Sequence, residues 1–137
     1  MNSVDQAAGI AYAVAVVDDD PRLRTMLAMQ VGETAQPSSF PTLEALESKT
    51  VAATPMVAIL GPTYGSAEGL AAIIRVRAIR PAMSVILVVH ELSTSVLQHA
   101  MRAGVSDVLA LPVEREQMAE ALIRAAESLP TAGAVVV

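Results

Sequence analysis

The chain has 137 residues, a formal net charge of −5 and no cysteine. This length suits one domain, and 53% hydrophobic residues with only 2% aromatics predict an aliphatic core, typical of a parallel sheet under alanine-rich helices. The acidic balance argues against nucleic acid or anionic lipid as a partner, and the lack of cysteine excludes disulfides and Cys-ligated zinc. The longest wholly apolar run, 10–17, is too short to span a bilayer, so we expect a cytoplasmic protein without membrane insertion.

The first predicted unit is a strand followed by a helix. The apolar run at 11–17 predicts a strand that is buried on both faces. Asp20 is a suitable N-cap and Pro21 a suitable first helical residue, while Gly32 is a suitable stop. The expected apolar stripe of this helix consists of Leu23, Met26, Leu27 and Val31.

Four further units follow the same pattern. Strands are expected at 35–40, 56–60, 85–89 and 107–111. Helices are expected at 42–49, from 70 to 79, between Ser93 and Gly104, and at 114–128, with 61–69 read as a flexible turn rather than a phosphate-binding loop. The helix from 70 carries Leu70, Ile73, Val76 and Ile79, of which the first three are its core stripe, and the helix after Ser93 carries Val96, Leu97, Ala100 and Met101. On the last helix Met118, Ala121, Leu122 and Ala125 are expected to face inward.

Five alternating strands and helices predict an α/β fold with a doubly wound, five-stranded parallel sheet. Right-handed crossovers favour the flavodoxin-like strand order 2-1-3-4-5. In that order the carboxyl ends of strands one and three flank the switch point, where ligands bind in such folds. A site is therefore expected from Asp18 to Asp20, the loop at Gly61 and the ends of strands four and five.

Three segments resemble the receiver domain of two-component response regulators, the CheY-like family. The segments are Val16-Val-Asp-Asp-Asp-Pro-Arg22, the stretch 75–81 with 84–89, and Ala103-Gly-Val-Ser-Asp-Val-Leu-Ala-Leu-Pro112. The resemblance covers about residues 11 to 128. It implies the flavodoxin-like fold, an acidic pair after strand one that helps to hold Mg²⁺, and a cis peptide before Pro112.

The chain departs from this family at the positions that carry its chemistry. Gly61 stands where a receiver has its phosphoacceptor aspartate, Val89 replaces the hydroxyl residue, and Leu111 replaces the lysine before proline. Lys49 is the only lysine, and Val108 replaces the usual aromatic residue of strand five. Since Gly61 cannot form an acyl phosphate, no catalytic residue is expected and the chain is interpreted as a degenerate pseudo-receiver.

A narrower resemblance is to the N-terminal pseudo-receivers of TadZ/CpaE-type pilus-assembly proteins, in which a ParA/MinD-like ATPase domain follows. The expected division is a flexible lead-in at 1–9, a pseudo-receiver at 10–129, and at 130–137 a linker and the start of an ATPase domain. The resemblance implies a non-enzymatic module for pilus or secretion-system assembly that works without phosphorylation and is recruited to a pole or a membrane-associated machine. The alternative is a receiver of another two-component protein that controls an output domain.

Asp18, Asp19 and Asp20, which we call the acidic remnant, either form a metal site or have structural roles only. Asp18 and Asp19 are expected to bind Mg²⁺ weakly or not at all, because Gly61 supplies no ligand, and Asp20 is expected to cap the helix. His90 and His99 lack the spacing of a helical metal pair. A further basic cluster either faces solvent or docks an acidic partner, and it comprises Arg75, Arg77 and Arg80.

Protein partners, including a second copy of the chain, are expected at two alternative surfaces. A second apolar stripe on the helix predicted from 70 to 79 favours a hydrophobic interface. It consists of Ala71, Ile74 and Ala78. The other surface lies on the side of the last two helices and is mostly charged. It consists of Gln98, Arg102, Glu116 and Arg124.

Overall fold

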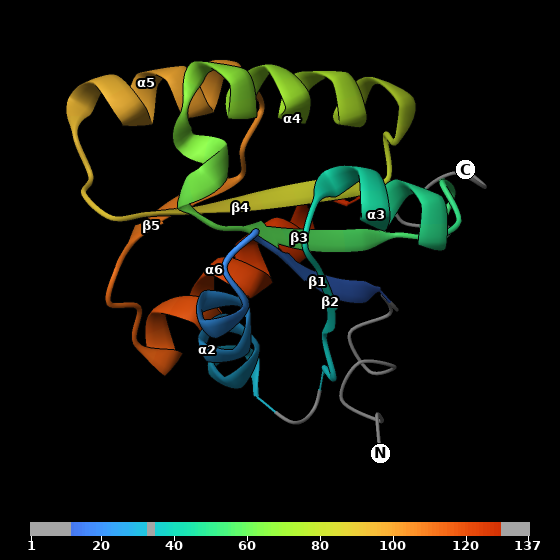
Figure 1. The fold of residues 1–137 in the computed structure, drawn as a ribbon, viewed down its shortest axis with the longest axis horizontal. Coiled ribbons are helices and arrows are strands. Elements are labelled where there is room, and N and C mark those ends of the chain that lie inside the picture. The colour runs from blue at the N-terminus through green and yellow to red at the C-terminus, as the bar shows by residue number, and fades with distance from the viewer. Residues whose placement is uncertain (1–11, 33–34, 130–137) are drawn as a thin grey trace.

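The computed structural model describes residues 12–32 and 35–129. The lead-in predicted at 1–9 and the linker predicted at 130–137 lie outside these residues. The described chain is a sheet with helices on both faces (Figure 1). Within the described ranges, no helix is both long enough and apolar enough to cross a membrane.

The sheet is parallel throughout, and its order is β2-β1-β3-β4-β5, which confirms the predicted flavodoxin-like topology. The carboxyl ends of β1 and β3 therefore lie side by side, with Val17 paired to Leu60. The strands are β1 (Ala13–Val17), β2 (Ser38–Phe40), β3 (Met56–Leu60), β4 (Met83–Val89) and β5 (Asp107–Ala110).

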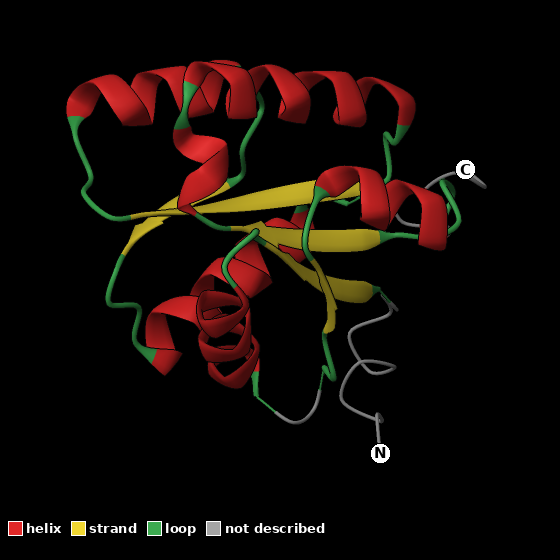
Figure 2. Ribbon diagram, in the orientation of Figure 1, coloured by secondary structure: helices red, strands yellow, loops and turns green. Residues whose placement is uncertain are grey.

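The helices form two layers, with α3, α4 and α5 on one face of the sheet and α2 and α6 on the other (Figures 1 and 2). Side chains cap four of their N-termini, because Asp20, Thr42, Ser66 and Ser93 each accept a hydrogen bond from a backbone N–H in the first turn. The helices are α2 (Pro21–Val31), α3 (Leu43–Lys49), α4 (Ala67–Ile79), α5 (Thr94–Arg102) and α6 (Arg115–Glu127), with a short 3-10 helix η1 (Pro62–Gly65).

Alternation along the strands divides the core into two aliphatic layers. Ala15 and Val17 pack under α3, α4 and α5, while Val14 and Val16 pack under α2 and α6. Every residue of β3 and β4 is buried, as expected for central strands covered on both faces. The site at the strand ends thus stands on a scaffold that is packed on both sides.

Four apolar residues of the predicted helices face solvent. The face that each helix buries against the sheet is narrower than its row of apolar residues indicates. On α2, Leu27 is buried, whereas its neighbour Met26 points about 100° away around the helix. On α5 only Ala100 is fully buried. The exposed residues, with their exposed fractions, are Met26 (37%), Ile79 (59%), Leu97 (40%) and Met101 (54%).

The segment 61–69 is also more ordered than the predicted flexible turn. Pro62 opens η1, and α4 begins at Ala67 instead of 70, because the Ser66 hydroxyl accepts a hydrogen bond from the Gly69 N–H. Proline at a first helical position and serine as N-cap are the sequence signals for these starts. The loop that leaves β3 is therefore a defined element beside the acidic residues.

Candidate functional site

Three aspartates follow β1 at the switch point of the sheet, as predicted, but their surroundings differ. Asp18 is 2% exposed, whereas Asp19 and Asp20 face solvent. Asp20 acts as the N-cap of α2, because its Oδ1 accepts a hydrogen bond from the Arg22 N–H at 3.0 Å. Only Asp18 thus points into the protein.

Both carboxylate oxygens of Asp18 accept hydrogen bonds from backbone amides. Oδ2 accepts from the Asp20 N–H at 3.0 Å, and Oδ1 accepts from the Thr63 N–H in η1 at 3.2 Å. The Arg24 side chain donates to the Asp18 carbonyl oxygen at 2.7 Å. Hydrogen bonds to a charged acceptor are among the stronger ones, so Asp18 fastens the β3–α4 segment to the end of β1.

Gly61 makes room for this arrangement. A Cβ atom at position 61 would lie 2.3 Å from Asp18 Oδ1 and 2.6 Å from its Cγ, distances that real side chains do not adopt. The backbone at this position is fixed, because the Gly61 N–H donates to the Val17 carbonyl at 2.9 Å. The Asp18 carboxylate therefore fills the space in which any side chain at position 61 would begin.

The acidic remnant does not fit a magnesium site. Mg²⁺ needs oxygen ligands at about 2.0–2.1 Å in octahedral geometry, but both Asp18 oxygens face amide hydrogens. Asp19 Oδ1 accepts a hydrogen bond from the Thr63 hydroxyl at 3.0 Å, and Gly61 has no ligand atom. Within residues 12–32 and 35–129, no group of three acidic or histidine side chains is arranged to hold a metal ion.

The other positions at which the chain departs from the receiver pattern carry apolar residues. Val89, at the end of β4, is buried, and Leu111 packs against the core layer under α2 and α6. Val108 is buried in β5. The Leu111–Pro112 peptide is cis, as the resemblance implies. Positions 61, 89 and 111 thus carry no carboxylate, hydroxyl or amine.

Tyr64, which the sequence analysis did not single out, links this region to α3. Its hydroxyl accepts a hydrogen bond from the Leu43 N–H at 2.9 Å, at the first turn of α3. Burial raises the pKa of Tyr64 above its usual range, and the nearby charges of Asp18 and Asp19 raise it further. Pro62 was the available signal that Tyr64 lies in a short helix. A turn prediction does not say in which direction the tyrosine ring points.

The three arginines predicted to face solvent or an acidic partner differ in exposure: Arg75 faces solvent, Arg77 is half-buried, and for Arg80, directly after α4, the prediction is wrong because it is buried. Arg80 is 3% exposed and donates to the Thr50 carbonyl at 2.9 Å and to the Thr50 hydroxyl at 2.7 Å. Arg77 donates to a backbone carbonyl of β4. Arg75 lies 3.5 Å from the Glu47 carboxylate at the surface.

The two predicted interface surfaces both face solvent. Ala71, Ile74 and Ala78 are exposed on α4, with Ile74 at 54%. On the other surface Gln98, Arg102 and Glu116 are exposed. Arg124 is exposed as well, but it forms an ion pair with Asp107 of β5.

The α5–β5–α6 side is less charged than the sequence indicates, because Leu97 and Met101 also lie exposed on α5. Both histidines are exposed, His90 in the loop after β4 and His99 on α5, and His99 Nδ1 lies 3.4 Å from the Ser95 hydroxyl.

Solved structures with the same architecture were found, although no family model and no curated protein matches the sequence. A protein of Burkholderia pseudomallei described as pilus assembly-related has a TM-score of 0.75 and 26% identity, over 88% of this chain and 92% of that chain. A Burkholderia thailandensis protein described as the pilus assembly protein CpaE gives 0.72 and 26%, over 85% and 99%. The chemotaxis response regulator CheY4 of Vibrio cholerae gives 0.67 and 20%, over 85% and 99%.

The strand order and the two helical layers give this chain the CheY-like receiver fold. Receiver domains are generally non-catalytic and interact with other proteins. Among its neighbours this domain is similar to pilus assembly proteins of the CpaE type.

Proposed function

We propose that this domain is a phosphorylation-independent interaction and localisation module of a Tad/Flp-type pilus or secretion-system assembly protein. The observation that carries the proposal is the Asp18 carboxylate in the space of a side chain at position 61. A receiver needs a free acceptor carboxylate there, and this chain has instead a buried acid bound to two amides. Similarity to two pilus assembly proteins at 26% identity supports the cellular setting.

The module acts through its surface, as a homodimer, as a docking platform for assembly components, or as both. For self-association we favour the α5–β5–α6 side, because Leu97 and Met101 add exposed apolar area to the charged residues there. In the full-length protein the domain would position a ParA/MinD-like ATPase domain beginning near residues 130–137. That domain boundary and the recruitment to a pole or a membrane-associated machine are parts of the same proposal.

Phosphorylation independence is tested with a small-molecule phosphodonor. The purified protein is incubated with acetyl phosphate and Mg²⁺, and its intact mass is measured beside a receiver that retains the acceptor aspartate. We expect no mass increase by one phosphoryl group, while the control receiver gains one. A phosphoryl group on Asp18 or Asp19 would refute the proposal and support the alternative of a signalling receiver that controls an output domain.

A further inference from the structure

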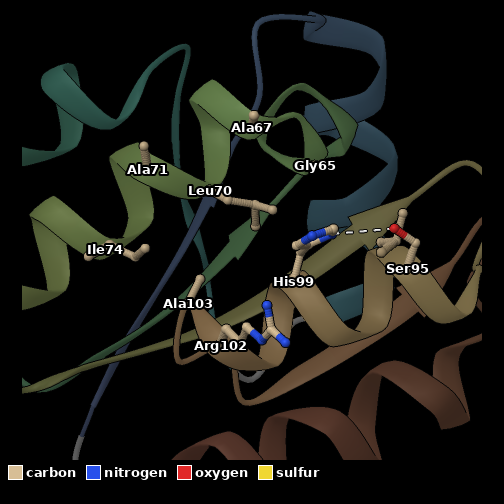
Figure 3. A pocket seen from close by; sticks show the side chains of 10 residues that line it. Gly65, Ala67, Leu70, Ala71, Ile74, Ser95, His99, Arg102 and Ala103 are labelled. Carbon is tan, nitrogen blue, oxygen red and sulfur yellow. Dashed lines mark hydrogen bonds between the residues drawn. The ribbon is translucent and has the colours of Figure 1, made fainter.

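An open groove separates α4 from α5 on the outer side of the sheet (Figure 3). Its volume is about 530 Å³, and its surface is mostly apolar. The α4 wall includes Leu70, Ala71 and Ile74, and the α5 wall includes Val96 and His99. Alanine at position 71 contributes to its openness, because a methyl group leaves space that a larger side chain would occupy.

The charged and titratable groups of the groove are all on one wall. Arg102 and His99 lie one turn apart on α5, and in Figure 3 they stand across the groove from Ala71 and Ile74. No aspartate or glutamate lines the groove, although the whole chain carries 14 acidic residues against nine basic ones. In the described part of the chain Arg102 forms no ion pair, whereas Arg75 and Arg124 each do.

We infer that this groove binds an amphipathic helix of another protein, with apolar residues against Ile74 and Leu70 and a carboxylate against Arg102. The α4 wall runs from Ala67 to Ile74, which at 1.5 Å per residue is about 10 Å, or two helical turns. A two-turn groove suits apolar anchors at positions i, i+3 or i+4, and i+7, the usual spacing for a helix bound in a groove.

A second copy of this chain fits the groove less well than an acidic partner does. In a two-fold contact the same surface meets itself, so an Arg102 side chain from each copy would enter one interface. Like charges that are brought together in a partly desolvated interface oppose association. A carboxylate-bearing partner would instead pair with Arg102.

This inference rests on the proposed function as an interaction module and specifies the partner chemistry. The probe is a displayed library of helix-favouring peptides of about 12 residues, the length at which isolated helices begin to form. Selection on the wild-type protein should enrich peptides with apolar residues one turn apart and an acidic residue beside them. Amide shifts in the ¹⁵N spectrum should then concentrate on α4 and α5 when a selected peptide is added.

Matched variants distinguish peptide binding in the groove from nonspecific binding elsewhere on the surface. Ile74→Gln should weaken peptide binding about tenfold, since it removes a large exposed apolar contact from the α4 wall. Ile79→Gln is the control, because Ile79 has similar exposure on the same helix but does not line the groove. Arg102→Gln should weaken binding about three- to fivefold at low salt and less at high salt, as expected for an exposed ion pair.

Three results of the peptide experiments would overturn the inference. These are failure to enrich any peptide, equal binding by the Ile74→Gln and Ile79→Gln variants, and selected peptides whose binding is unaffected by Arg102→Gln. Loss of a wild-type dimer in the Ile74→Gln variant would also overturn it, because the occupant would then be a second copy. Failure of the phosphorylation test leaves these binding measurements unaffected, so the two proposals can fail separately.

Discussion

The contact between Asp18 and Gly61 predicts that even a methyl group at position 61 destabilises the domain. In Gly61→Ala the new Cβ would begin 2.3 Å from Asp18 Oδ1 and 2.8 Å from its Cβ, so the carboxylate has to move. That movement breaks one or both of its hydrogen bonds to the Asp20 and Thr63 amides. A hydrogen bond to a charged group contributes about 1.5–3 kcal/mol, so the expected loss is about 3 kcal/mol.

A loss of this size is measurable for a chain of 137 residues. Domains typically have unfolding free energies of about 5–15 kcal/mol, and about 3 kcal/mol corresponds to a melting temperature lowered by about 10 °C. Urea titration followed by circular dichroism gives the free energy directly. Gly65→Ala is the control, because a Cβ there meets only Val89 Cγ1 at 3.4 Å, an ordinary contact, and it should stay within about 0.5 kcal/mol of wild type.

A double-mutant cycle attributes the effect to Asp18. In an Asp18→Gly background the carboxylate and its Cβ are gone, so Gly61→Ala should cost little, and the coupling energy should be about 2–3 kcal/mol. The reasoning is refuted if Gly61→Ala is as stable as wild type, or if it costs the same in both backgrounds. Either result would mean that the carboxylate does not occupy the space beside position 61.

Three other expectations follow from the site and the surface. Low millimolar Mg²⁺ should leave the melting temperature unchanged in wild type and in Asp19→Ala, and a rise of several degrees that Asp19→Ala abolishes would contradict our interpretation. Tyr64→Phe should lose about 1–3 kcal/mol in urea, because it leaves the Leu43 N–H without its partner. Because the pKa of Tyr64 is raised, its hydroxyl stays protonated to a higher pH in the folded state than in the unfolded state. Wild-type stability should therefore fall above about pH 10, and this fall should be smaller in Tyr64→Phe. In sedimentation, Met101→Asp should abolish a dimer that Ile74→Asp retains, and a wild-type monomer at high micromolar concentration would exclude self-association.

The sheet could be predicted because its signals are local and strong. The run 56–60 is apolar throughout and coincides with β3, and Asp20, Pro21 and Gly32 mark the ends of α2 in the structure as they do in the sequence. Handedness of the crossovers then leaves few strand orders. Helix faces were less predictable, because apolar spacing does not reveal how wide the contact with the sheet is, and Leu97 and Met101 therefore turn out exposed.

The candidate site was predicted in its residues but not in its geometry. Sequence spacing places Asp18 and Gly61 at neighbouring strand ends, and the missing acceptor is evident from the glycine itself. That Asp18 turns into the vacated space depends on the amides of Asp20 and Thr63, which only the folded backbone brings into position. Similarly, Arg80 looks like a surface residue in sequence, but its long side chain reaches Thr50 from the end of α4.

The packing of Asp18 against Gly61 has a consequence for protein engineering. An aspartate introduced at position 61 would begin its side chain against the Asp18 carboxylate, so Gly61→Asp alone should cost stability. A variant that is to carry an acceptor at position 61 therefore has to change Asp18 as well, although Asp18 also holds η1 through the Thr63 N–H. The two positions form a coupled pair that has to be redesigned together.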